Sequence, residues 1–278
     1  MRTLLCLGAG LLMSSCLMAQ ETPAAGSPGL PLWEVGAFGA LASVPAYPAS
    51  NERVGRVLAL PFLFYRGEVL RAERGSVGAR VVHTDDFELD VGFAASLPAS
   101  SNDIALRQGM PDLGTLLEFG PRIKWTLARP TPGSRLRLDL PLRTVLEING
   151  GVRGQGYVLE PELAYEVRNV GDGWSLSTGV SLVVGDQQLN QYFYGVPTAF
   201  ATATRPAYEA QAGLISTRLN LSTSKRLNPD VRVFGYARYD LHNGAANRAS
   251  PLFAQDQGAS VGIGVAWTLG RSEARATN

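Results

Sequence analysis

Cysteine and histidine are scarce in this chain of 278 residues, which has two of each. Cys6 and Cys16 both precede the predicted end of an export leader, so the mature chain would have no thiol for a disulfide or a thiolate-bound metal. Basic residues number 25 and acidic residues 24, so the basic surplus of a nucleic-acid-binding surface is missing. After residue 19, no stretch reaches the roughly 18 consecutive apolar residues of a membrane-spanning helix. These absences argue against disulfide-stabilised, nucleic-acid-binding and helical membrane proteins.

Sequence motifs for common chemistries are also absent. There is no P-loop, GxSxG elbow, HExxH motif or Cys/His cluster. A hydrolase needs a nucleophile, a base and an orienting group in one site, and only His242, Asp240 and Ser250 lie close enough in sequence to suggest one. We therefore predict a non-enzymatic protein with no catalytic residue, metal ligand or cofactor. A surface hydrolase is the lesser alternative.

The N-terminus has the pattern of a secretory signal peptide. Arg2 supplies the positive end, residues 4–13 form the apolar segment, and Leu17–Ala19 form an imperfect small-residue cleavage site before Gln20. In an alternative interpretation the leader is that of a lipoprotein and Cys16 is lipidated. We expect residues 1–19 to be removed, and residues 20–31, rich in Pro, Ala and Gly, to form a flexible lead-in.

The last strand-like segment, Ser260 to Leu269, alternates between large apolar and small residues. Successive side chains of a strand point to opposite faces, so this segment has one wholly apolar face and one small, polar face. Similar segments recur along the chain, and most have ten or more residues. That length is typical of tilted strands crossing a membrane, which need about 9–11 residues. The fold class predicted is all-β: a single antiparallel transmembrane β-barrel over residues 32–269, followed by a polar tail at 270–278.

We predict twelve strands, because longer connections alternate with short turns, as outer loops and periplasmic turns do in such barrels. The longer connections are expected around residues 98–113, 148–155, 187–207 and 242–257. Even parity then requires a short hairpin at Glu73–Ser76. Ten strands remain the alternative if residues 67–83 form one bent strand and an end segment lies outside the barrel. The predicted strands are 32–43, 54–65, 67–73, 76–83, 86–97, 114–128, 134–147, 156–168, 173–186, 208–223, 230–241 and 258–269.

Charged side chains occupy one face of most central strands, opposite an apolar face. An Arg or Lys in the middle of the bilayer costs about 2–4 kcal/mol, so we expect the charged face to line the barrel. Two interpretations stay open, a salt-bridged filling and a narrow water-filled pore. The predicted lumen-lining charges are Glu118, Arg122, Lys124, Arg137, Asp139, Arg143, Glu160, Glu162, Glu166, Arg218, Arg232 and Arg238.

A soluble β-sandwich, with the apolar face as its core, is the alternative fold. Strand length, the leader and the Tyr and Trp residues near strand ends favour the barrel, because aromatic side chains gather at membrane interfaces.

One long loop is rich in aromatic residues, which could contact a partner or fold over the barrel mouth as a plug. The candidate partner contacts are Tyr192, Phe193, Tyr194 and Tyr208.

Seven segments in chain order resemble the MipA/OmpV family of outer-membrane proteins. They are Leu58–Gly67, Gly109–Asp112, Phe119–Arg122, Tyr192–Val196, Ala203–Tyr208, Ser250–Leu252 and the last strand. The resemblance implies a barrel in the outer membrane of a Gram-negative cell envelope. For one branch it implies a scaffold joining a lytic murein transglycosylase to a bifunctional penicillin-binding protein, both enzymes of peptidoglycan metabolism. Other branches resemble porins, so a small-solute channel is the alternative function. The resemblance supplies no catalytic or ligand-binding residues.

Overall fold

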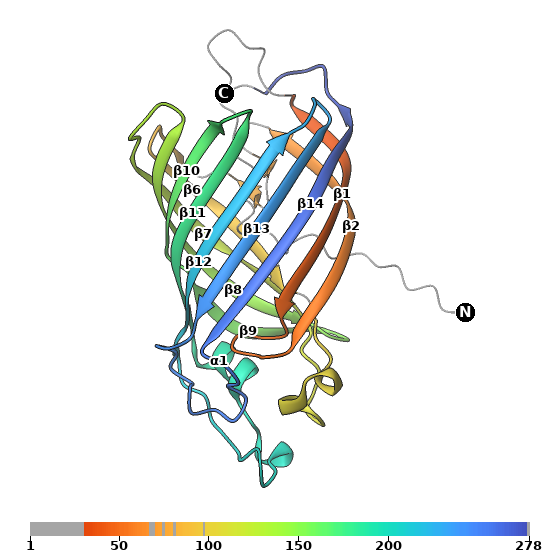
Figure 1. Ribbon diagram of the computed structural model, residues 1–278, viewed down its shortest axis with the longest axis vertical. Coiled ribbons are helices and arrows are strands. Elements are labelled where there is room, and N and C mark those ends of the chain that lie inside the picture. Colours follow the sequence, from red (N-terminus) through yellow and green to blue (C-terminus); the bar gives the residue numbers. More distant parts are fainter. Residues whose placement is uncertain (1–30, 67–69, 74–75, 80–81, 97, 277–278) are drawn as a thin grey trace, which may run out of the picture.

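The described strands of this chain form one antiparallel sheet that curls into a barrel, with a short helix and long loops at one end (Figure 1). The computed structural model describes residues 31–66, 70–73, 76–79, 82–96 and 98–276. The predicted leader and nearly all of the lead-in lie outside these residues. No helix within the described ranges is long and apolar enough to cross a membrane.

Most strands are 8 to 15 residues long, as membrane strands require. In chain order they are β1 (Trp33–Pro45), β2 (Arg53–Arg66), β3 (Leu70–Glu73), β4 (Ser76–Ala79), β5 (Val82–His83), β6 (Phe87–Ser96), β7 (Thr115–Ala128), β8 (Ser134–Ile148), β9 (Val152–Leu159), β10 (Glu162–Val170), β11 (Trp174–Gly185), β12 (Gly213–Arg226), β13 (Val231–Leu241) and β14 (Gln257–Arg271). The helix α1 (Gln187–Tyr194) lies between β11 and β12.

These elements occupy twelve positions around the barrel, which confirms the twelve-strand prediction. β9 and β10 are two parts of one crossing, interrupted at Glu160 and Pro161, and each pairs with β8 and β11. β4 and β5 both lie against β6. The first and last strands pair over ten positions, so β14 joins β1 and brings the two ends of the sheet together. Glu73 pairs with Ser76, as the predicted hairpin requires.

Two predicted boundaries are wrong. The expected long connection at residues 148–155 is a three-residue hairpin, because β9 begins at Val152 and pairs with β8. Within β9, a Cβ added at Gly156 would lie 2.1 Å from the Asp186 carboxylate. That glycine therefore makes room for a neighbour. The strand expected from residue 208 begins at Gly213, because Tyr208 instead pairs with Val196 in the loop region.

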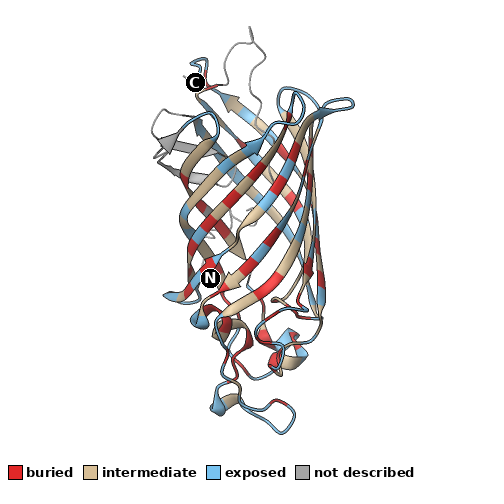
Figure 2. Cartoon of the chain, turned by 90° about the vertical axis from the view of Figure 1, so that its left-hand side faces the viewer, coloured by how far each residue is buried: buried red, intermediate tan, exposed pale blue. Residues whose placement is uncertain are grey.

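The outer surface is apolar along β14, as the sequence pattern predicts. Val261, Ile263, Val265, Trp267 and Leu269 are 42–63% exposed, whereas Ser260 and Ala266 on the opposite face are buried. Figure 2 shows the same banding of exposed and buried residues along several strands. A face this apolar on the outside of a closed sheet calls for hydrocarbon around it.

All four tryptophans lie on the outer surface near one end of the barrel. Trp33 and Trp174 begin β1 and β11, and Trp125 and Trp267 lie near the ends of β7 and β14. Their exposed fractions are 38–56%. Antiparallel strands bring these positions to the end formed by the short turns, called the turn end below. Tryptophans gather where a bilayer meets water, so they mark one membrane interface.

Candidate functional site: the barrel interior and its cap

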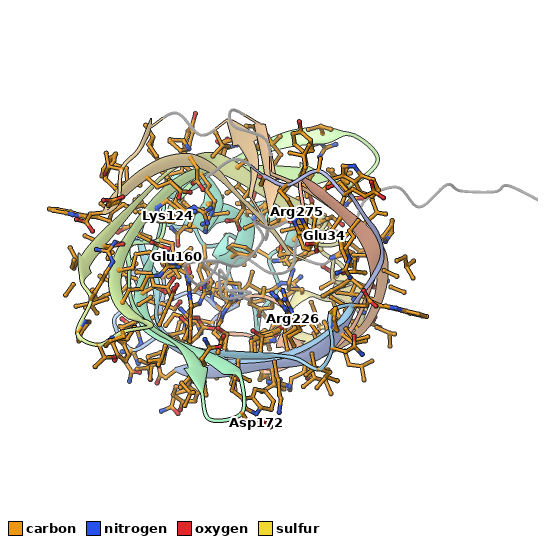
Figure 3. All side chains as sticks on the ribbon, turned by 90° about the horizontal axis from the view of Figure 1, so that it is seen from above. Glu34, Lys124, Glu160, Asp172, Arg226 and Arg275 are labelled. Carbon is orange, nitrogen blue, oxygen red and sulfur yellow. The ribbon has the colours of Figure 1, made fainter. Side chains whose placement is uncertain are left out.

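The inner face of the barrel carries paired charges on β6 to β8, β10, β12 and β13. Seen along the barrel axis, Lys124, Glu160 and Arg226 lie inside the ring of strands, while Asp172 lies at its rim (Figure 3). Alternation along each strand explains this placement, because outward positions on the same strands are apolar. The structure therefore brings the predicted lumen-lining charges to one surface.

The first cluster joins β6 to β7. Arg122 contacts Asp90 through two hydrogen bonds of 2.9 and 2.7 Å. Lys124 reaches both Glu88, at 2.9 Å, and Asp90, at 2.8 Å. The side chains of Lys124 and Glu88 keep 21% and 23% of their surface accessible. Water can therefore reach this part of the interior.

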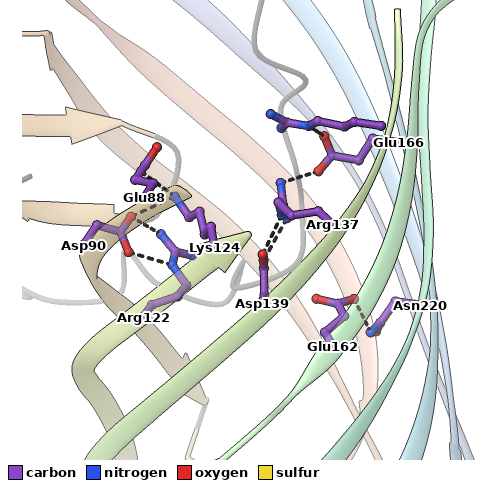
Figure 4. Close-up of polar contacts among 10 residues, drawn as sticks. Glu88, Asp90, Arg122, Lys124, Arg137, Asp139, Glu162, Glu166 and Asn220 are labelled. Carbon is purple, nitrogen blue, oxygen red and sulfur yellow. Dashed lines mark hydrogen bonds and ion pairs between the residues drawn. The ribbon is translucent and has the colours of Figure 1, made fainter. Parts of the chain in front are cut away.

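A second group lies across β8, β10 and β12 (Figure 4). Arg137 makes ion pairs with Asp139 on its own strand and with Glu166 on β10. Glu162 accepts a hydrogen bond of 2.9 Å from the Asn220 amide on β12. These contacts satisfy polar groups that are largely buried, which is the condition for keeping charges inside a protein.

A continuous belt of ion pairs crosses the interior between this group and the end of the barrel that carries the long loops. Arg143 bridges Glu118 at 2.8 Å and Glu160 at 2.6 Å, and Arg218 bridges Glu160 at 2.6 Å and Asp240 at 2.8 Å. The belt links β7, β8, the β9–β10 junction, β12 and β13. Cross-strand pairs of opposite charge stabilise a sheet, and here they also tie non-adjacent strands together.

The remaining inner wall, formed by β13, β14, β1 and β2, is largely apolar, which the charge pattern did not predict. Phe38, Leu58, Phe62, Phe234 and Tyr236 face the interior from β1, β2 and β13; we call them the aromatic patch. Phe38, Leu58 and Phe62 are half-buried and pack against buried Phe234. The signal for this wall is on β2, where Leu58 to Tyr65 reads as a continuous apolar run and not as an alternation. Such a run has apolar side chains on both faces.

Arg232 and Arg238, the last two predicted lumen charges, lie on the same inner face of β13 as the aromatic patch. They flank Phe234 and Tyr236, two positions away on either side. Both arginines take part in polar or electrostatic interactions.

The end of the barrel opposite the tryptophans is covered by folded loops, called the cap below. One apolar cluster in the cap includes Tyr194 and Leu189 of α1, and a second contains Tyr47, Ile104 and Leu252. The loops themselves are residues 46–52, 98–114, 186–212 and 242–256. They pack against one another like a small core at this end of the barrel.

Polar side chains lock the cap loops together. Asn247 is fully buried and donates to Asn190 at 2.8 Å, and it accepts from Tyr208 at 3.2 Å. Arg205 donates to the Phe200, Leu106 and Gln108 carbonyls, which joins two loops about a hundred residues apart in sequence. Such fully paired buried networks favour one arrangement of the loops.

The aromatic residues predicted as partner contacts are part of this cap. Tyr194 is fully buried, so it cannot belong to a contact surface in this arrangement. Tyr192, Phe193 and Tyr208 are partly buried against the cap clusters, and Tyr192 donates to Glu147 at 3.1 Å. Burial raises the pKa of Tyr47 to about 12, and it also raises the pKa values of Tyr192 and Tyr194.

The three residues considered for hydrolysis have other partners. His242 is buried, and its Nδ1 lies 2.9 Å from the Ile215 carbonyl oxygen. Ser250 donates to the Tyr194 carbonyl at 2.7 Å, and Asp240 binds Arg218. Each group is used structurally. Among the described residues, no group of three or more His, Cys, Asp or Glu side chains could hold a metal ion.

A barrel of long strands with an apolar outside, paired charges inside and interfacial tryptophans defines a membrane-spanning β-barrel. The family model described as "MltA-interacting protein MipA" matches residues 35–269. This chain therefore belongs to the MipA family of outer-membrane proteins, and its location is the cell outer membrane, where lipid surrounds its apolar surface.

Comparison with solved structures finds other barrels at low similarity. A NanC porin shares 12% identity and a TM-score of 0.38, with 86% of this chain and 100% of that chain covered. Outer membrane phospholipase A from Escherichia coli shares 14% identity and a TM-score of 0.37, covering 89% and 94%. A TodX mutant described as a monoaromatic hydrocarbon channel shares 10% identity and a TM-score of 0.36, covering 87% and 91%. No curated protein matches the sequence. Likeness at this level identifies no activity.

Proposed function

We propose that this barrel is a non-enzymatic scaffold in the outer membrane that binds a murein transglycosylase and a penicillin-binding protein. The observation that carries the proposal is the match of residues 35–269 to a family described as interacting with MltA. The interior supports a non-enzymatic role. Its charged side chains form ion pairs with one another, and the residues considered for hydrolysis make structural contacts.

The turn end is the surface we assign to the murein enzymes, since short turns of outer-membrane barrels face the periplasm. Asp86, in the turn before β6, makes an ion pair with Arg129, in the turn after β7. Arg129 also donates to the Asp85 carbonyl at 2.6 Å. The Asp86 and Arg129 side chains are 55% and 52% exposed, so this pair offers both charge signs to a partner.

Retention of a purified murein transglycosylase on the immobilised mature barrel, in nanodiscs, tests the proposal. The unchanged barrel should retain the enzyme, and Asp86→Ala with Arg129→Ala should lower its affinity at least tenfold. Asp103→Ala is the matched control, because that carboxylate is exposed at the cap end. It should leave retention within twofold. Failure to retain any murein transglycosylase or penicillin-binding protein would overturn the proposal.

A small-solute channel is the second candidate, and the accessible charges of the interior favour it. Arg135 keeps 25% of its side-chain surface accessible and Glu88 keeps 23%. Planar-bilayer recordings decide between the two functions. A channel gives discrete conductance steps, whereas a barrel closed by its cap and its ion-pair belt gives none.

A further inference from the structure

The interior of the barrel has two chemically different walls. Most of the ion pairs lie on the wall from β6 to β12 and extend to Asp240 near the cap end of β13, whereas the aromatic patch lies on the wall formed by β13, β14, β1 and β2. If the interior served only as an inert filling, ion pairs could extend around the whole inner wall. Half-buried aromatic rings facing the interior instead resemble the lining of a small-molecule site, which is mostly apolar with a few placed polar groups.

Glycines in β14 allow the rings to lie close against the wall. A Cβ added at Gly262 would be 2.3 Å from the Tyr236 ring, and one added at Gly264 would be 2.2 Å from the Phe234 ring. The rings therefore fill the places of the missing side chains. Phe38 stacks on Phe234 with ring centroids 5.1 Å apart, and Phe62 contacts Phe64 at 4.8 Å. The result is a shallow apolar surface directed toward the centre of the barrel.

Cationic and hydroxyl groups border this surface on β13 and β12. Arg232 and Arg238 flank the two rings on the same face of β13, about 20 Å apart at 3.3–3.4 Å per residue. The strand partners of Phe234 and Tyr236 are Ser224 and Ser222, both buried. Each guanidinium has five N–H donors, so it can donate hydrogen bonds to an added anionic group while it keeps its existing contacts.

We propose that the aromatic patch and the two flanking arginines form a binding site for small anionic aromatic solutes, such as an aromatic carboxylate. The ring stacks on half-buried Tyr236, and the carboxylate pairs with Arg232 or Arg238. Anions are favoured over cations because the nearest acid on the same face, Asp240, already binds Arg218 and Ser216. The site does not depend on the scaffold function.

Binding of 2-naphthoate to the full mature barrel in nanodiscs, followed by fluorescence anisotropy, tests this site. Empty nanodiscs correct for partition into lipid. We expect saturable binding that weakens as salt is added, because charge attraction contributes. The neutral 2-naphthalenemethanol and the cationic 2-naphthylmethylammonium should bind at least tenfold more weakly.

Variants separate the two parts of the site. Arg238→Gln should weaken binding of 2-naphthoate at least tenfold, and Tyr236→Leu should do the same by removing the stacking surface. Arg122→Gln is the matched control on the charged wall, where Arg122 pairs with Asp90, and should stay within twofold. Heat-modifiable gel mobility checks that each variant is folded, and Tyr236→Leu keeps the test valid if Arg238→Gln does not fold.

Three results would overturn the proposal: no saturable binding above empty nanodiscs, equal binding of the ammonium probe, or an equal loss in Arg122→Gln. None of these outcomes involves a murein enzyme. Failure of this site is therefore distinguishable from failure of the scaffold function.

Discussion

Phe38 of β1 and Phe234 of β13 stack with their planes 6° apart, although β14 lies between their strands. The two rings meet over the inner face of β14 at Gly264, which pairs with Phe234 of β13 on one side and with Ala40 of β1 on the other. A single glycine thus lets two strands that are not neighbours touch through their side chains.

Gly264→Ala should destabilise the barrel because its Cβ would lie 2.2 Å from the Phe234 ring and 2.7 Å from the Gly39 carbonyl oxygen. Overpacking of this kind costs about 1–3 kcal/mol. Urea unfolding in lipid vesicles, followed by tryptophan fluorescence, measures the change. The same substitution at Gly55, where no heavy atom lies within 4 Å of the added Cβ, should leave stability nearly unchanged. Equal losses at both positions would contradict the stacking account.

Arg218→Met should cost about 3 kcal/mol of unfolding free energy, because it breaks the belt and leaves two carboxylates without a partner they share. Those carboxylates are Glu160 and Asp240, and their side chains are 13% and 10% exposed. Arg271→Met removes an ion pair with Asp230 whose members are 37% and 54% exposed, and should cost less than about 1 kcal/mol. The same urea titration compares the two variants. A smaller loss for Arg218→Met than for Arg271→Met would show that the belt does not contribute to stability.

Alkaline pH should loosen the cap through its buried tyrosines. Tyr47 is buried, donates to the Leu252 carbonyl at 2.6 Å, and has its pKa raised from 10.0 to about 12. The unfolded chain releases this proton first, so the stabilisation is complete below pH 10 and is lost as the pH rises from 10 toward 12. Each such proton changes the free energy by about 1.4 kcal/mol per pH unit in that window.

Tyr47→Phe should therefore lower stability at pH 8, by about 1 kcal/mol for the lost hydrogen bond. It should also flatten the decline in stability between pH 10 and 12. Protection of the cap loops from proteolysis across this range provides the measurement. An unchanged alkaline slope in the variant would show that Tyr47 does not titrate in this way.

The barrel fold could be predicted because it follows from the alternation of side chains within each strand. The ion pairs of the interior depend instead on how the strands are aligned with one another. Alternation along Ser260–Leu269 fixes which face is apolar without knowledge of any other strand. The pairing of Arg218 with Glu160 joins residues 58 positions apart, and no feature of either segment specifies it. Charge alternation along a strand therefore indicates which residues share a face, but the partner of each depends on the closed sheet.

The helix in the cap and the aromatic patch were not predicted, for different physical reasons. The helix α1 follows an Asp186 N-cap, whose side chain accepts from the Leu189 N–H at 2.9 Å, a signal that was present but short. In β2, apolar side chains on both faces hide the usual alternation. The aromatic loop residues were correctly singled out as unusual, yet their burial depends on loops from four separate parts of the chain.

Hydrocarbon covers the outside of this barrel, and two residues of β14 allow a matched test of that placement. Ile263 and Leu269 lie on the same outer face with equal exposure, 63% each, but Ile263 is near the middle of the strand and Leu269 is near the turn end. Arginine costs about 2–4 kcal/mol at the bilayer midplane and about 0–1 kcal/mol near its interface. Urea unfolding in lipid vesicles should therefore show a large loss for Ile263→Arg and a small one for Leu269→Arg. Equal, small losses at both positions would mean that water, and not lipid, surrounds this face.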